Sequence, residues 1–170
     1  MKMTDLATRE EWAALEREFH ERFGMNPRVY DETGAGITGE RLWSNPLCPA
    51  LRATPGGVGA VCSVANAALT AQAAREGRTV IDACDAGLVV ITVPVIVDGA
   101  LIGIVGGCGR LPADGEVESF LVSKASGLGE DEVEGLATRV PVMSRADVEA
   151  AAAFLEGKVA DILARAGAAA

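Results

Sequence analysis

A pair of apolar runs joined by Asp98-Gly99 restricts the fold more than any other feature: VVITVPVIV precedes the pair and ALIGIVGGCG follows it. An Asp-Gly pair between β-branched runs is typical of a type I′ turn with two residues in its loop. Residues 88–107 are therefore expected to form a β-hairpin. The centre of the domain is then expected to be an antiparallel sheet.

The two-residue loop also predicts which residues face one another across the hairpin. Side chains alternate along a strand, so alternate facing pairs share one face of the sheet. On the apolar face these pairs are Val97 with Ala100, Val95 with Ile102, Val93 with Ile104, Ile91 with Gly106, and Val89 with Cys108. This face is expected to point into the core or into a ligand cavity. Pro94 has no N–H for the ladder, so it implies an edge or a bulge, and a bulge would shift this alternation.

A cysteine stands at each end of the hairpin segment. Cys84 precedes the first run and Cys108 ends the second, so both thiols are expected at the end of the sheet that lies far from the Asp-Gly turn. Glycines crowd the same end, namely Gly87, Gly106, Gly107 and Gly109. Glycine allows a backbone or a cofactor to approach closely, so this end is a candidate site.

Local signals define the remaining elements. Thr8 and Glu11 form a capping-box pattern before a helix over 8–23, and Thr54-Pro55 begins a helix that ends at Gly77 and contains Cys62. Strands are expected within 27–37 and over 79–83, and further helices over 115–126, 130–137 and 145–165. The order predicts a single α+β domain over 1–170, with a core over about 5–142 and a C-terminal helix.

Composition excludes several classes of function. The net charge is −9, which disfavours binding to nucleic acid. The N-terminus lacks the apolar segment of a signal peptide, and the apolar stretch near 88–97 is too short to span a bilayer. We therefore expect a cytoplasmic protein that is not bound to a membrane. The four cysteines are expected to be reduced there.

The cysteine-containing segments resemble the PocR sensory-domain family. The matching features are Cys48 followed by Leu51-Arg52, then Thr54-Pro55-Gly56 and Cys62; later come Cys84, Ala86-Gly87-Leu88, the run VPVIVDGALIG and Gly106-Gly107. The resemblance implies a PAS-like antiparallel sheet flanked by helices. It also implies a sensory domain that binds a small organic molecule, such as a short diol. Two positions depart from the family pattern, because Asp85 stands where histidine is common and Cys108 where glutamine is common.

The four cysteines allow two interpretations. Cys48, Cys62, Cys84 and Cys108 could together hold zinc or an iron–sulfur cluster, for which four thiolates are the right number of ligands. Their spacings match no zinc knuckle, so the fold would have to bring them together. Alternatively, they are small buried apolar residues without a ligand. We weigh the two interpretations about equally.

Other residues are candidates for contacts with a ligand. Ile91, Val93 and Ile104 would form an apolar floor, with Cys84, Asp85 and Arg52 at the rim. Trp43 could belong to the core or to the wall of the pocket. Arg52 could bind a ligand carboxylate or pair with Asp85, and we favour the pair.

His20 is the only histidine and lies in the first helix, which argues against a Cys-His catalytic pair and against an enzyme.

Two functions follow from these expectations. The first is a non-catalytic sensor of a small organic ligand, which signals through a homodimer or a partner protein. The alternative is a redox or gas sensor in which the four cysteines hold an iron–sulfur cluster or zinc. The last helix repeats Val148, Ala152, Leu155, Val159 and Ile162, so it could form a dimer seam or pack on its own sheet.

Overall fold

The predicted hairpin stands at the centre of the computed structural model, which describes residues 1–168. Strands β3 (Val89–Val97) and β4 (Ala100–Pro112) pair antiparallel and are joined at Asp98 and Gly99. Both turn residues have positive φ angles, 51° at Asp98 and 78° at Gly99, as a type I′ turn requires. The hairpin and its turn are confirmed.

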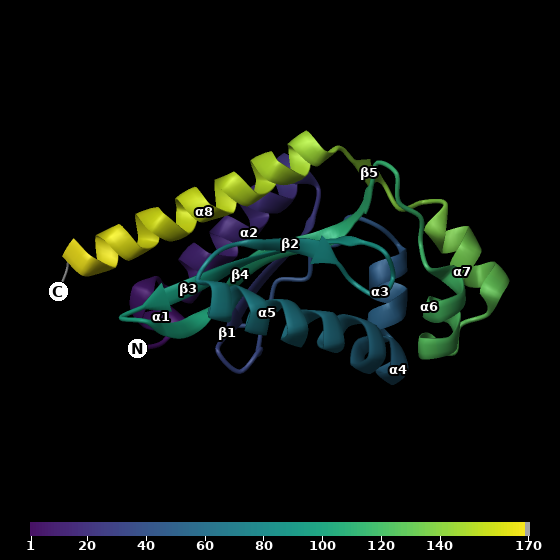
Figure 1. The fold of residues 1–170 in the computed structure, drawn as a ribbon, viewed down its shortest axis with the longest axis horizontal. Coiled ribbons are helices and arrows are strands. Elements are labelled where there is room, and N and C mark those ends of the chain that lie inside the picture. The colour runs from purple at the N-terminus through teal and green to yellow at the C-terminus, as the bar shows by residue number, and fades with distance from the viewer. Residues whose placement is uncertain (169–170) are drawn as a thin grey trace.

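This hairpin forms the centre of a five-stranded sheet, which has helices on both faces (Figure 1). Strand β1 (Asn26–Asp31) lies beside β4 and strand β2 (Val80–Ala83) lies beside β3, which gives the order β1–β4–β3–β2. These neighbours are antiparallel, and the short strand β5 (Val142–Met143) runs parallel to the end of β4. The fold is the α+β architecture with an antiparallel sheet that the sequence predicts.

Two bulges change the register between β3 and β4. The expected pairing holds from the turn only as far as Ile96 with Leu101. Beyond that point it is wrong by one residue, because Val95 lies opposite Gly103, Val93 opposite Val105, Ile91 opposite Gly107, and Val90 opposite Cys108. Pro94 lies next to the bulge between Val95 and Ile96, in keeping with its missing N–H donor.

The shift places the expected floor residues on two different faces. Ile91 and Val93 are buried in the larger core, whereas Ile104 pairs with Pro94 and therefore points to the other face. Cys108 pairs with Val90 and lies on that other face too. The expectation that Ile91, Val93 and Ile104 share one face is therefore wrong.

The larger core lies between the sheet and two long helices (Figure 1). Helix α2 (Arg9–Phe23) begins with the predicted capping box of Thr8 and Glu11, and the short helix α1 (Met3–Leu6) precedes it. Helix α8 (Arg145–Ala168) begins after Ser144, whose Oγ accepts a hydrogen bond from the Asp147 N–H at 3.1 Å. Its residues Val148, Ala152, Leu155, Val159 and Ile162 are all buried in this core.

The opposite face of the sheet is covered by a continuous helix from Pro55 to Glu76. It consists of α4 (Pro55–Gly57), a π-helical segment η1 (Val58–Ser63) and α5 (Val64–Glu76). By length and composition alone this helix could cross a membrane. Here Leu69 and Ala73 pack against Val80 and Val90 of the sheet, so the helix is part of the folded domain.

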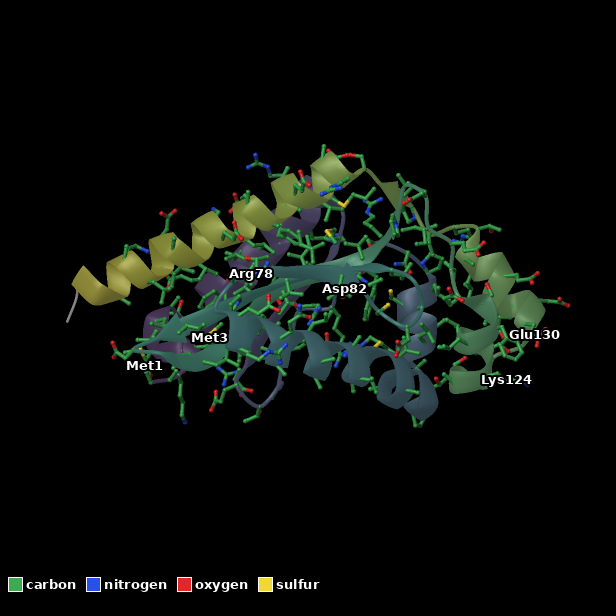
Figure 2. The ribbon with its side chains drawn as sticks, in the orientation of Figure 1. Met1, Met3, Arg78, Asp82, Lys124 and Glu130 are labelled. Atoms are coloured by element: carbon green, nitrogen blue, oxygen red, sulfur yellow. The ribbon has the colours of Figure 1, made fainter. Side chains whose placement is uncertain are left out.

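Three further helices close one end of the molecule. Helix α3 (Leu47–Arg52) packs with α6 (Ser119–Ser126) and α7 (Glu130–Ala137) around a smaller apolar cluster that includes Leu51, Leu88 and Val133. Figure 2 shows Lys124 and Glu130 on these helices, far from the N-terminus. The helix expected over 115–126 begins only at Ser119, and neither α3 nor β5 was expected.

Candidate functional site

A cavity of about 100 Å³ lies between the sheet and the helices of the α3–α5 side. Strands β1, β3 and β4 contribute Arg28, Val90 and Cys108, and helices contribute Leu51, Val61 and Ala65. The loop before α3 adds Trp43, and the turn between β2 and β3 adds Cys84 and Leu88. The cavity is therefore formed by segments distant in the sequence.

All four cysteines line this cavity. Cys48 lies in α3, Cys62 in the π-helical segment, Cys84 directly after β2, and Cys108 in β4. Cys108 reaches the cavity because the bulge between Val95 and Ile96 turns its side chain to the Val90 face. Residues of π-helical segments are often found at functional sites, and here such a segment carries Cys62.

Two asparagines fix the loop that contains Trp43 and the start of α3, which contains Cys48. The Asn45 side chain accepts a hydrogen bond from the Cys48 N–H at 2.8 Å and donates one to the Gly109 carbonyl at 2.7 Å. The Asn26 side chain accepts a hydrogen bond from the Ser44 N–H at 2.6 Å. Gly109 has a φ angle of 92°, which glycine adopts without strain. These contacts join the loop to strands β1 and β4.

Burial keeps the cavity thiols protonated. It raises the pKa of Cys48 to about 12, and it also raises the pKa of Cys62, Cys84 and Cys108. A neutral thiol is a weak nucleophile and a weak metal ligand. Within residues 1–168, no group of three or more histidine, cysteine or acidic side chains is arranged to hold a metal ion. The four neutral thiols therefore contribute to a largely apolar cavity wall.

Arginines supply the positive charge of the cavity. Arg28 is only 4 % exposed, and its three guanidinium nitrogens have no hydrogen-bond partner within the described chain. Its guanidinium carbon lies 5.6 Å from the centre of the Tyr30 ring. Arg52 also lines the cavity, with its guanidinium carbon 5.8 Å from the centre of the Trp43 ring.

A second, more polar hollow of about 310 Å³ adjoins the cavity. Both hollows are lined by Arg28, Arg41, Arg52 and Glu40. Glu40 accepts a hydrogen bond from Arg17 at 2.7 Å, so its charge is already paired. This outer hollow therefore shares its arginines with the cavity.

The structure separates the expected ligand residues into two groups. Trp43, Arg52 and Cys84 line the cavity. Asp85 is exposed on the surface outside the cavity lining, and no ion pair joins it to Arg52 within the described residues. Ile91 and Val93 lie in the larger core behind the sheet, and Ile104 lines a different surface hollow.

Sequence reasoning missed Arg28, the most deeply buried charge of the site. The signal available was the alternation of Asn26, Arg28 and Tyr30 along β1, which places all three on one face. A strand with polar residues on one face usually turns that face to solvent, so the pattern alone predicts an exposed arginine. The loop that contains Trp43 and the helix that contains Cys62 bury it instead.

Comparison with known families identifies the chain through one family model. The model of the sensory domain found in PocR matches residues 5–168, nearly the whole chain. Searches among curated proteins and among solved structures gave no match. The family match includes every element of the cavity.

Proposed function

Because the chain belongs to the PocR sensory-domain family, we propose that it binds a small organic molecule in the thiol-lined cavity and does not convert it. The observation that carries this proposal is the cavity itself, which combines an apolar wall with a few polar groups, as small-molecule sites do. Its size supports a small ligand. An apolar cavity of about 150 Å³ accepts the six carbons of benzene, so about 100 Å³ suits about four or five non-hydrogen atoms.

The chemistry of the cavity supports binding without catalysis. The thiols are neutral, and the histidine that could activate one, His20, lies on α2 with its Nδ1 2.8 Å from the Met25 carbonyl oxygen. Nucleophilic cysteines need a neighbouring base or positive charge that lowers their pKa. Here burial is the largest effect and raises the pKa of Cys62, although Arg52 and Arg28 lower it.

A ligand screen with a cavity-filling variant tests the proposal. Short alcohols, diols, acids, amides and amines are added to the full chain, and the shift of the melting temperature is measured. In Ala65→Leu the larger side chain fills part of the cavity, so the ligand-induced shift should fall. Ala68→Leu on the exposed face of the same helix is the matched control and should keep it. A panel in which no compound stabilises the protein overturns the proposal.

We further propose that the output passes through a homodimer or a partner protein in the cytoplasm. The support is the position of α8, which packs on the face of β3 and β4 opposite to the cavity. A ligand that shifts these strands would therefore also act on α8. Sedimentation of the full chain with and without a ligand from the screen tests this, and an unchanged state without partner binding contradicts it.

A four-thiolate zinc or iron–sulfur site is the second candidate. It is supported by the position of all four cysteines around one cavity, since four thiolates match both groups. Binding would require loss of the thiol protons and closer approach of the sulfurs. Anaerobic purification followed by metal analysis and an absorption spectrum tests it, and a colourless, metal-free protein contradicts it.

A further inference from the structure

We infer that the ligand of this cavity is a small organic carboxylate whose charged end binds Arg28. This inference rests on the proposed function and names the chemical class of the ligand. It starts from the most unusual group of the site, a guanidinium that is 96 % removed from solvent and has no partner on Nε, Nη1 or Nη2. An arginine stays charged in proteins, and a buried charge without a partner is strongly unfavourable.

Within the described residues no carboxylate forms an ion pair with Arg28, and this includes Glu16, which lines the outer hollow with it. Glu40, which lines the same cavity, is engaged by Arg17 at 2.7 Å. The four thiols are held neutral by burial. The guanidinium carbon of Arg28 lies 5.6 Å from the centre of the Tyr30 ring, and its nitrogens remain without hydrogen-bond partners. The missing negative charge is therefore expected from a ligand.

The position of Arg28 suits the charged end of a ligand that enters from outside. Arg28 lines both the inner cavity and the outer polar hollow, together with Arg52 and Arg41. This basic passage occurs in a protein whose net charge is −9, so it is a local feature and not part of a generally basic surface. A planar guanidinium with several donors matches a carboxylate through two parallel hydrogen bonds.

The inner wall selects an organic anion over an inorganic one. Beyond the arginines the cavity is bounded by Leu51, Val61, Ala65, Leu88 and Val90. A phosphate or sulfate ion would leave this apolar wall without a partner, whereas an alkyl group of two or three carbons would cover it. With the size of the cavity, these contacts describe a short carboxylate such as propanoate.

The test compares four probes of nearly equal size. Propanoate, propanamide, propane-1,2-diol and inorganic phosphate are titrated into the full chain by calorimetry, and melting temperatures are recorded in parallel. Propanoate should bind, and the neutral amide, the diol and phosphate should bind about tenfold to a hundredfold more weakly, because each lacks either the charge or the alkyl group.

Variants of Arg28 assign the effect to this side chain. Arg28→Met should weaken propanoate binding about tenfold to a hundredfold while leaving the ligand-free melting temperature unchanged or higher, because it removes an unpaired buried charge. Arg28→Lys keeps a positive charge without the planar pair of donors and should give intermediate affinity. Arg78→Met, at an exposed arginine that lines neither hollow (Figure 2), is the matched control and should bind as the parent does.

The outcomes separate this inference from the function on which it rests. Binding of the diol or the amide in place of propanoate overturns the carboxylate assignment and leaves the sensory proposal intact. Binding of phosphate as tightly as propanoate overturns the organic class. Parent-like propanoate affinity in both Arg28 variants overturns the role of Arg28. Failure of every probe here and in the wider screen overturns both proposals.

Discussion

At the scale of single residues, Glu16 on α2 is a second buried group that matters for stability. It is 3 % exposed, and burial raises the pKa of its carboxyl from 4.5 to about 7, with the charge of Glu40 adding to the effect. Between about pH 4.5 and 7 the folded protein therefore holds a proton that the unfolded chain lacks. The free energy of unfolding should fall as pH rises through this window, by about 3 kcal/mol from this group.

The variant Glu16→Gln isolates this effect. Urea unfolding at pH 5 and pH 8 should show a smaller loss of stability with rising pH in the variant than in the parent, because glutamine has no proton to lose. Glu21→Gln changes an exposed carboxylate on the same helix and should keep the pH dependence of the parent. Equal pH dependence in the parent and in Glu16→Gln would contradict the prediction.

Single residues also show which parts of the site can be predicted from the sequence and which cannot. Trp43, Arg52 and the four cysteines could be proposed as site residues from the sequence, and all of them line the cavity. Arg28 could not, because its burial is produced by segments distant in the sequence, such as the loop of Trp43 and the helix of Cys62. A lone arginine in a short strand is more often solvated, so no local rule identifies this one.

At the scale of elements, the signals that predict correctly are local, whereas the register of the hairpin, which is predicted incorrectly, depends on more than neighbouring residues. The capping box of Thr8 and the turn at Asp98-Gly99 depend on neighbouring residues, and both are present. The register of β3 and β4 depends on bulges whose position the hairpin loop does not determine. A shift of one residue moves every side chain of the strand to the other face of the sheet. Ile104 therefore does not share a face with Ile91 and Val93, whereas Cys108 lines the cavity.

Two glycines test the local part of this reasoning with the same substitution. Gly99→Ala should destabilise the protein by about 1 kcal/mol, because its φ angle of 78° is strained for alanine. Gly157→Ala, at an exposed position inside α8 with open space around it, should stabilise the protein by about 0.5–1 kcal/mol. Urea unfolding of both variants gives the two values. Changes of the same sign would show that the turn conformation or the helix assignment is incorrect.

At the scale of the whole molecule, the sheet separates two layers, the cavity with its four cysteines on one face and the core of α2 and α8 on the other. A sensor must transmit ligand binding from one layer to the other. Strand β3 contributes Val90 to the cavity and Ile91 to the core, so neither layer can unfold without exposing the other side of the same strand. We expect the two layers to unfold as one cooperative unit.

The variant Leu155→Ala tests this coupling from the side remote from the cavity. Leu155 is fully buried on α8, so its truncation should lower the free energy of unfolding by about 2–5 kcal/mol. Circular dichroism follows all the helices, whereas thiol labelling follows only the cavity layer, because every cysteine of the chain lines the cavity. Both probes should shift to lower urea by the same amount. A smaller shift in thiol labelling would mean that the layers unfold separately, and a ligand in the cavity would then have no route through the sheet to α8.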